Sequence, residues 1–327
     1  MEELATKIRD LLRNSTGRQI SVEIEPPTLG KSINGVFRVL DPLVEKGIKY
    51  VNITYHPEHV LAYVEQNNQR YTIAQRRRPG TVGVAGAIQA RYASKGVEAV
   101  PHVICTGFTR HDVEEYVIDL AFLGIENIMA LRGDTSRDPT GRKLPFTRMP
   151  GGHAYASELI EQMVDLRRGV YVGAEGGEPI DFCIGAACYP EGHPESRSLD
   201  EELCWLRAKV DAGADYLVTQ MFFDNDVYKR FVDRARKAGV EAPIVPGIKI
   251  LASYRHLETL PSIFHCSIPE KLRKAALEKA KNGKDLRSIG VDWCVEQCRD
   301  LIDYGVPGIH FYATRNSPVE EVINRIS

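Results

Sequence analysis

Short apolar runs alternate with longer amphipathic stretches along most of the chain, and this alternation predicts the secondary structure. The short runs are rich in β-branched residues and have the length of strands, whereas the longer stretches have the period of helices. A strand that is repeatedly followed by a helix predicts a parallel sheet joined by crossover helices. We expect eight strands, at Ile20–Ile24, Tyr50–Thr54, Ala99–Ile104, Asn127–Leu131, Phe182–Ala187, Tyr216–Thr219, Ile244–Ile248 and Gly308–Tyr312.

The helical stretches each end close to a glycine. A glycine just after a helix can take the left-handed conformation that closes it, so these residues support the predicted helix ends. The closing glycines are Gly124, Gly169, Gly213, Gly239 and Gly305. The predicted helices before them are Asp112–Leu123, Tyr155–Arg168, Ser198–Ala212, Asp226–Ala238 and Asp285–Tyr304.

Eight parallel strands close naturally into a barrel, so the expected fold is α/β, a single (β/α)8 TIM barrel that forms one catalytic domain over residues 1–327. A small second domain is the alternative that the length allows. An open doubly wound sheet would carry a glycine-rich phosphate loop directly after its first strand, and this chain has none. Gly80, Gly83 and Gly86 lack the spacing of a dinucleotide fingerprint and are interpreted as turn and packing glycines.

Composition adds limits on the partners and the location. Apolar residues make up 43% and charged residues 26%, with a net charge of −2 and scattered signs, which argues against a nucleic-acid or membrane surface. The one basic run, Arg76–Arg78, precedes Pro79 and Gly80 and is interpreted as a solvated turn. Seven irregularly spaced cysteines favour reduced thiols in the cytoplasm. Neither a signal peptide nor a membrane span is expected.

Polar residues follow nearly every predicted strand. In a barrel the carboxyl ends of the strands surround the active site, so these residues are expected to meet at one mouth and bind a ligand. No Cys/His spacing typical of a metal site unites them, and Cys294 and Cys298 are interpreted as core residues. The residues at the strand ends are Glu23, Glu25, Thr54, Tyr55, His102, Arg132, Gly133, Asp134, Tyr189, Glu191, His193, Thr219, Gln220, Tyr312, Thr314 and Arg315.

Several of these segments together resemble one family, the methylenetetrahydrofolate reductases, flavin enzymes that make 5-methyltetrahydrofolate. The similarity runs from about Ser21 to Arg315, and its most specific parts are Leu131–Asp134 and Tyr189–Glu195. Because the chain ends just after its eighth strand–helix unit, it resembles the short bacterial form of the family. The other matching segments are Val22–Pro27, Ile53–Tyr55, Pro101–His102, Tyr155–Ser157, Lys209–Asp215, Thr219–Gln220, Pro246–Ile248 and His310–Tyr312.

The resemblance implies that FAD lies across the barrel mouth. Arg132 and Lys209 would complement its diphosphate, and Gly133 would let the backbone approach it closely. Asp134 would lie near the flavin ring and tune its potential as one of the two catalytic residues. The positions that match the family's cofactor contacts are Thr54, Tyr55, His102, Arg132, Gly133, Asp134, Ala156, Tyr189, His193, Glu202 and Lys209.

The implied reaction has two half-reactions at one site. NADH or NADPH passes hydride to the flavin, which then passes it to 5,10-methylenetetrahydrofolate. The folate ring must open before it accepts hydride, which requires protonation at N10. Glu23 matches the family's acid, and burial of a carboxyl group can raise its pKa towards neutrality. Gln220 matches a residue that binds the pterin and touches the nicotinamide, and Arg315 is a further folate contact.

Some positions depart from the family pattern. Trp205 and Ala208 stand where relatives carry Asn and Arg, so the adenosine or diphosphate contacts are expected to be rearranged. The loop of residues 135–153 is interpreted either as a lid or as an insertion. The expected partners are methylenetetrahydrofolate, NADH or NADPH, and further copies of the chain in a homo-oligomer. The alternatives are a flavin-free, pterin-binding barrel that transfers methyl groups, and a non-catalytic folate-binding protein.

Overall fold

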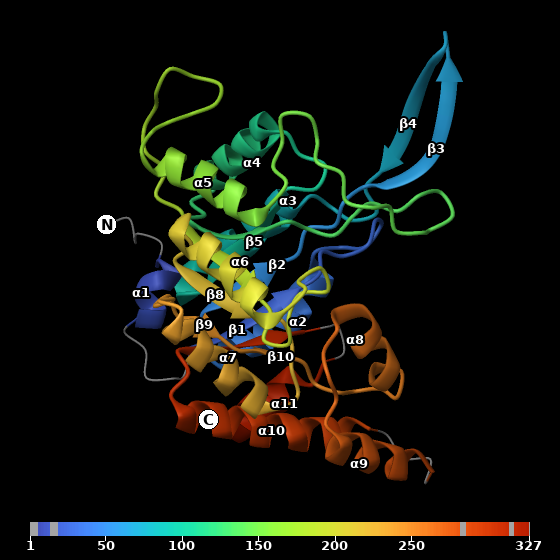
Figure 1. Cartoon of the computed structure of the whole chain (residues 1–327), viewed down its shortest axis with the longest axis vertical. Helices are drawn as coiled ribbons and strands as arrows, with labels where there is room; N and C mark the ends of the chain where they lie inside the picture. The colour runs from blue at the N-terminus through green and yellow to red at the C-terminus, as the bar shows by residue number, and fades with distance from the viewer. Residues whose placement is uncertain (1–5, 14–18, 282–285, 314–316, 327) are drawn as a thin grey trace.

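The computed structural model describes residues 6–13, 19–281, 286–313 and 317–326. All strands of its main sheet run parallel, and most of the covering helices follow them in alternation, which confirms the predicted α/β barrel (Figure 1). The sheet order is β10-β11-β1-β2-β5-β6-β7-β8-β9. The bounds are β1 (Gln19–Ile24), β2 (Tyr50–Ile53), β5 (Glu98–Ile104), β6 (Asn127–Leu131), β7 (Cys183–Cys188), β8 (Tyr216–Thr219), β9 (Ile244–Val245), β10 (Gly247–Ile248) and β11 (Gly308–Tyr312).

The seventh predicted strand forms in two halves, which corrects the single strand expected at Ile244–Ile248. β9 pairs with β8, and β10 pairs with β11. Pro246 separates the halves because proline has no N–H for a ladder, and its carbonyl accepts from the backbone N of His310 at 3.0 Å. A Cβ on Gly247 would lie 2.2 Å from the carbonyl oxygen of Thr219, so only glycine fits there. The broken strand joins the two ends of the sheet.

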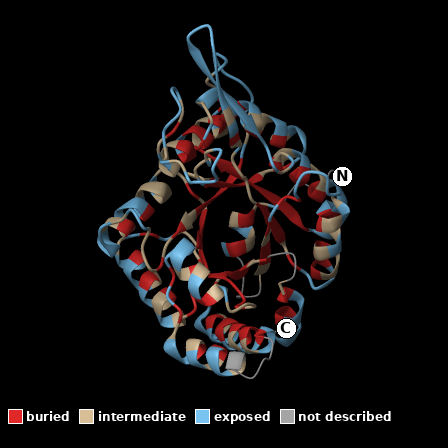
Figure 2. Ribbon diagram, turned by 90° about the vertical axis from the view of Figure 1, so that its right-hand side faces the viewer, coloured by how far each residue is buried: buried red, intermediate tan, exposed pale blue. Residues whose placement is uncertain are grey.

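Helices surround the strands with their buried faces inward, as Figure 2 shows. The five predicted helices form within two residues of their expected ends, except that the expected start at Asp285 lies outside the described residues. All five closing glycines have positive φ. The helices are α1 (Ile8–Arg13), α2 (Asn34–Glu45), α3 (Thr81–Tyr92), α4 (Arg110–Phe122), α5 (Ala156–Arg167), α6 (Leu199–Asp211), α7 (Asn225–Lys237), α8 (His256–Phe264), α9 (Glu270–Lys281), α10 (Arg287–Tyr304) and α11 (Val319–Ile326), with a 3-10 turn at Ala93–Lys95.

Successive side chains of each strand face alternately the helices and the barrel interior. In β1, Val22 and Ile24 belong to the large core shared with the helices. Ser21 and Glu23 therefore point inward, and Ser21 meets His310 of β11 at 2.8 Å. The interior below the mouth is closed by a smaller apolar cluster that includes Tyr50 and Tyr216. The strand alternation thus decides which polar residues can reach the mouth.

The short helix α1 covers the end of the barrel opposite the mouth. Its Ile8 and Leu12 are 0% and 2% exposed and join the interior cluster. The amide of Asn127 in β6 holds the start of α1, because its Oδ1 accepts from the backbone N of Ile8 at 2.9 Å and its Nδ2 donates to the carbonyl of Thr6 at 3.0 Å. The guanidinium of Arg9 also pairs with Asp181 at 2.6 Å. These contacts fix α1 as the floor of the barrel.

A two-stranded antiparallel hairpin, β3 (His59–Gln66) and β4 (Gln69–Gln75), projects from the molecule after β2 (Figure 1). The sequence analysis did not predict it. Its turn residues Asn67 and Asn68 both have positive φ, as the tight turns of hairpins require. Along the hairpin only Val60 is buried. The hairpin stands at the mouth end of the barrel because it follows the carboxyl end of β2.

Two further findings concern the cysteines and membrane insertion. Six of the seven cysteines are buried and all are free thiols, and Cys294 and Cys298 lie in the core with their sulfur atoms 4.0 Å apart. This confirms the interpretation of that pair as core residues.

Within the part of the chain that the structure describes, no helix combines the length and apolar character needed to span a bilayer.

Candidate active site

Glu23 lies on the interior side of β1, at the level where the strands end. The neighbouring strands pair it with Asn52 of β2 and with Tyr312 of β11. His102 of β5 reaches the same space, with its Nε2 atom 3.5 Å from Oε2 of Glu23. The side chain of Glu23 is 24% exposed, so it remains accessible from the mouth.

Both members of this pair are uncharged at neutral pH. Burial raises the pKa of Glu23 to about 8, with the charge of Lys249 acting in the opposite direction and that of Glu25 adding to the rise. Burial also lowers the pKa of His102 to about 3, so its contact with Glu23 is not an ion pair. A carboxyl group that keeps its proton at neutral pH and stays accessible can act as a general acid.

Glu25 has a different environment although it is only two residues away. Its Oε2 atom accepts from Nη2 of Arg78 at 2.8 Å, and the other Nη of Arg78 donates to the carbonyl of Pro26. Arg78 is therefore not a solvated turn residue, which corrects that interpretation for one member of the basic run. Among the described residues, Glu23 has no Lys or Arg nitrogen within 4.0 Å. The two carboxylates are thus distinguished by Arg78.

Cationic groups gather on the opposite side of the mouth. Arg132, just after β6, makes two hydrogen bonds of 2.6 Å with Glu195. Lys209 of α6 donates to the carbonyl of Ala187 at 2.9 Å and lies 5.6 Å from the ring centre of Tyr189. Burial lowers the pKa of Lys209. A diphosphate would therefore meet one arginine already paired with a carboxylate and one partly buried lysine.

Glu202 holds the loop after β7 rather than facing solvent, since it is only 1% exposed. Its Oε2 atom accepts from the backbone N of His193 at 3.2 Å and from the hydroxyl of Ser196 at 2.9 Å. The rings of His193 and Tyr189 meet edge to face at 4.8 Å. Through Glu202, α6 positions the loop that carries two of the predicted cofactor contacts.

The segment after β6 turns sharply at Gly133, whose φ is +86°. A Cβ there would lie 2.8 Å from Cβ of Ile104, so glycine is required for packing as well as for φ. The next residue, Asp134, is exposed, and its carboxylate lies 3.5 Å from Nζ of Lys143. The 135–153 loop that follows touches the hairpin, because the backbone N of Val60 donates to the carbonyl of Arg137 at 3.1 Å.

The remaining predicted cofactor contacts lie at the ends of β2 and at the start of α5. Thr54 bonds His56 at 3.0 Å, and Tyr55 packs edge to face against Phe108 at 5.3 Å. Ala156 is the first residue of α5. Its neighbour Tyr155 stacks on Trp205 of α6, with ring centres 5.1 Å apart, and both rings are exposed. Trp205, one of the positions expected to depart from the family pattern, thus forms an exposed aromatic stack with Tyr155.

The predicted substrate contacts are only partly described. Gln220, directly after β8, borders a small cavity together with Tyr189 and Phe264. Its side-chain oxygen accepts from the backbone N of Met221 at 2.9 Å, which leaves the amide NH2 for a ligand. The predicted contact Arg315 lies outside the described residues.

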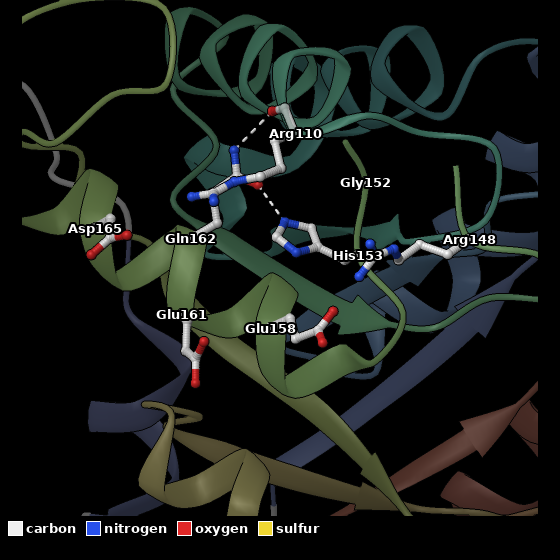
Figure 3. Close-up of a pocket in the computed structure, with 8 residues that line it drawn as sticks. All are labelled: Arg110, Arg148, Gly152, His153, Glu158, Glu161, Gln162 and Asp165. Carbon is white, nitrogen blue, oxygen red and sulfur yellow. Dashed lines mark hydrogen bonds between the residues drawn. The ribbon is translucent and has the colours of Figure 1, made fainter. Parts of the chain in front are cut away.

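A larger pocket of about 360 Å³ lies between the start of α4 and α5 (Figure 3). Its buried part is polar: Nε2 of His153 bonds Oε1 of Gln162 at 2.5 Å, and Gln162 donates to the carbonyl of Arg110 at 2.8 Å. Glu161 and Asp165 project from the same face of α5. None of the predicted site residues lines this pocket, so the volume of a pocket does not locate the candidate site in this chain.

Sequence reasoning missed Lys249, which follows β10 and is 8% exposed. Its signal was visible, because it is the one charged residue within the apolar run Ile244–Leu251. With Val245 in the interior cluster, strand alternation also turns Gly247 and Lys249 inward. The missed residue therefore shares the interior of the mouth with Glu23.

A family model described as methylenetetrahydrofolate reductase matches residues 7–327. The 5,10-methylenetetrahydrofolate reductase of Escherichia coli (strain K12) is 28% identical over 320 residues, which cover 96% of this chain and 94% of that protein. The probable methylenetetrahydrofolate reductase (NADPH) of Caenorhabditis elegans is 28% identical over 94% of this chain. This chain spans 42% of the length of the Caenorhabditis elegans protein and 48% of that of the Arabidopsis thaliana methylenetetrahydrofolate reductase (NADH) 1.

Among solved structures, an uncharacterized protein from Clostridium thermocellum that binds two copies of 5-methyl-5,6,7,8-tetrahydrofolic acid is similar in fold. The TM-score is 0.56 at 14% identity, and the match covers 97% of each chain. At this identity the similarity supports the fold alone.

Proposed function

Because the chain belongs to the methylenetetrahydrofolate reductase family, we propose that it reduces 5,10-methylenetetrahydrofolate to 5-methyltetrahydrofolate with NADH or NADPH. The observation that carries the proposal is Glu23, an inward carboxyl group at the mouth whose pKa is raised to about 8. The folate accepts hydride only after N10 is protonated, and a general acid is most effective when its pKa lies near the working pH.

The cofactor of the proposed reaction is FAD, and the donor set of the mouth fits it. Arg132 and Lys209 supply positive charge for a diphosphate, and the exposed stack of Tyr155 on Trp205 offers an aromatic face for a flat ring. Thr54, Tyr55, His102, Gly133, Ala156, Tyr189 and His193 would complete its surroundings, with Glu202 acting through the loop that it holds. When bound, FAD would supply the hydride relay between the nicotinamide and the folate, in a ping-pong sequence.

The chain's own residues provide proton transfer, binding and electrostatics. Glu23 holds the proton that N10 receives and becomes a carboxylate when it gives the proton up. Gln220 binds the pterin by donating from its amide NH2, while its side-chain oxygen stays on the backbone N of Met221. Asp134 keeps a negative charge near the flavin ring and so disfavours further negative charge there. Arg315 is proposed as a further folate contact on the family resemblance alone.

The remaining elements of the proposal concern organisation. We expect residues 1–327 to act as one catalytic domain, in the cytoplasm, as a homo-oligomer. Mass measurement of the purified protein in solution tests the oligomer directly. A monomer at micromolar concentration would contradict it.

The experiment that tests the function has two stages. The purified protein is incubated with FAD and desalted, and its visible spectrum is recorded; a yellow protein that NADH or NADPH bleaches is expected. Addition of 5,10-methylenetetrahydrofolate should then restore the oxidised spectrum and yield 5-methyltetrahydrofolate. A protein that binds no FAD would contradict the proposal and favour a flavin-free, pterin-binding barrel that transfers methyl groups. A protein that binds folate but oxidises no nicotinamide, even with an artificial acceptor, would indicate a non-catalytic role.

A further inference from the structure

Lys249 is a buried lysine in the interior of the barrel mouth. Its residue exposure is 8%, and its Nζ atom donates to the main-chain carbonyl of Tyr312 at 2.9 Å. Tyr312 is in turn the strand partner of Glu23 in the register of β11 and β1. The lysine is therefore fixed to the backbone beside the strand that carries the proposed acid.

The charge of Lys249 has no close counter-ion. Among the described residues, no carboxylate oxygen lies within 4.0 Å of its Nζ atom, and its one hydrogen-bond acceptor is a neutral carbonyl. A buried cation without a paired anion is costly, so proteins rarely keep one without a use. Burial lowers the pKa of Lys249, and the carboxyl groups of Glu23 and Glu25 act in the opposite direction. Glu25 is already paired with Arg78, which leaves Glu23 as the unpaired group.

The other titratable groups around Glu23 do not provide a compensating charge. His102 on β5 is neutral because burial lowers its pKa to about 3. Tyr312 on β11 is also neutral, because burial raises its pKa well above its usual value. On the far side of Lys249, burial lowers the pKa of His256, and Lys249 lowers it further. Among the described residues, Lys249 is, apart from the paired Glu25, the charged group that acts on Glu23.

We propose that Lys249 is a positioning residue that acts through Glu23. Its ammonium group, held by the carbonyl of Tyr312, stabilises the carboxylate that Glu23 becomes after proton donation, and thereby sets the pH above which the enzyme lacks its acid. This inference rests on the proposed function. In the step concerned, the O–H bond of Glu23 breaks, an N–H bond forms at N10 of the folate, and the electron pair stays on the carboxylate, whose charge Lys249 stabilises. Glu23 regains a proton from solvent before the next turnover.

The test compares Lys249→Met with Lys249→Arg, which keeps a permanent positive charge. Carboxyl resonances of 13C-glutamate-labelled protein are titrated with pH by NMR, and Glu23→Gln identifies the Glu23 signal. Without the lysine charge, the Glu23 midpoint should move up by about one pH unit, at the low end of the effect of a nearby charge. Lys249→Arg should keep the wild-type midpoint. Lys229→Met, which removes a lysine paired with Asp300 at 2.8 Å, is the matched control and should leave the midpoint unchanged.

Kinetic measurements on the same FAD-loaded variants complete the test. Folate reduction requires protonated Glu23, so in Lys249→Met its rate should begin to fall at a pH about one unit higher than in the wild type. The rate of bleaching by NADH or NADPH should stay at the wild-type value. Circular dichroism verifies folding, and Lys249→Gln replaces Lys249→Met if the latter does not fold.

Three outcomes would overturn the inference. An unchanged Glu23 midpoint in the folded neutral variant, Lys249→Met or its replacement Lys249→Gln, would show that the two side chains are not coupled by charge. An equal shift in Lys249→Arg would assign the effect to packing instead of charge. A shifted midpoint with an unchanged pH profile of folate reduction would reject Glu23 as the acid, and with it the catalytic part of this inference, while the coupling between the two side chains would stand.

Discussion

The carboxyl group of Glu23 meets the imidazole of His102 inside the barrel mouth, with Oε2 and Nε2 3.5 Å apart, and neither group is charged at neutral pH. Such a contact is unusual between these residue types, which form an ion pair when both are ionised. Here burial disfavours charge on both. The consequence is an acid that holds its proton without a counter-ion, and the first two predictions follow from it.

Replacing Glu23 with Gln should abolish folate reduction while leaving FAD binding and bleaching by NADH or NADPH intact. The amide has nearly the same shape but cannot deliver a proton, and loss of a general acid costs about 10²- to 10⁴-fold. Rapid-mixing absorbance measurements separate the two half-reactions. Folate turnover near the wild-type rate would show that another group protonates N10.

The pH dependence of the wild-type protein should differ between the half-reactions. The protonated carboxyl group is the active form, and its pKa of about 8 means that it is fully available below that pH and is lost as the pH rises above it. Folate reduction should therefore fall about tenfold per pH unit above about 8, whereas nicotinamide oxidation lacks this decrease. A folate rate that declines already above pH 5 would indicate an ordinary, solvated carboxyl group.

Replacing Glu195 with Gln should strengthen FAD binding. Both Nη atoms of Arg132 donate to the carboxylate of Glu195, at 2.6 Å each. This carboxylate therefore competes with an incoming diphosphate. Removing its charge should improve the dissociation constant about fivefold, the effect of a partly exposed ion pair. Fluorescence titration of the apoprotein measures it, with the exposed Asp200→Asn as the control. Weaker binding would mean that Glu195 holds Arg132 in its binding position.

Replacing Asp134 with Asn should raise the potential of the bound flavin. The exposed carboxylate repels the extra negative charge of the reduced ring, and about 1 kcal/mol for charges some 4 Å apart in water corresponds to about 20 mV in a two-electron couple. A redox titration against a reference dye measures the change. Asp138→Asn, in the same loop, removes an equal charge that is bound to Thr140, and should have little effect. Equal potentials in wild type and Asp134→Asn would place this residue away from the ring.

Replacing Ile8 with Ala should destabilise the barrel by about 2–5 kcal/mol, because a fully buried aliphatic side chain leaves a cavity. Asp10→Ala changes an exposed residue of the same helix and should have little effect. Urea unfolding followed by circular dichroism compares the two. Equal midpoints would show that α1 contributes little to the floor.

The barrel itself was predictable from the sequence because its strands are buried on both faces. Such strands are nearly continuous apolar runs with clear ends, as in Asn127–Leu131 and Gly308–Tyr312, whose predicted bounds are those observed. The break of the seventh strand was visible only as Pro246. Its consequence depends on the neighbours that each half finds, which the local sequence does not specify.

The hairpin was not predicted because its apolar residues do not alternate between a buried face and a solvent-exposed face. Val64 and Tyr71 face each other on one side, and Tyr63 and Thr72 on the other, so apolar residues occur on both. The useful signal was the pair Asn67-Asn68 between two runs rich in Val, Tyr and Ile, which favours a tight hairpin turn.

The candidate site was predictable in outline and not in its electrostatics. Strand alternation puts Glu23 and Glu25 on the same face, and only Arg78, more than fifty residues away along the chain, distinguishes them by pairing with one. The partner of Arg132 likewise lies on a different loop. Charge pairing across the barrel is a tertiary property, which periodicity along the chain cannot show.

The position of α1 has a consequence for the order of folding. This helix leaves the ribosome before the surfaces that receive it, because those come from Asn127, Cys183 and Tyr216, which are synthesised much later. Contacts between residues so distant in sequence form slowly because the intervening chain must first be brought together. Helix α1 therefore completes its packing, with Ile8 and Leu12 buried, only after at least the first six strands of the barrel have assembled.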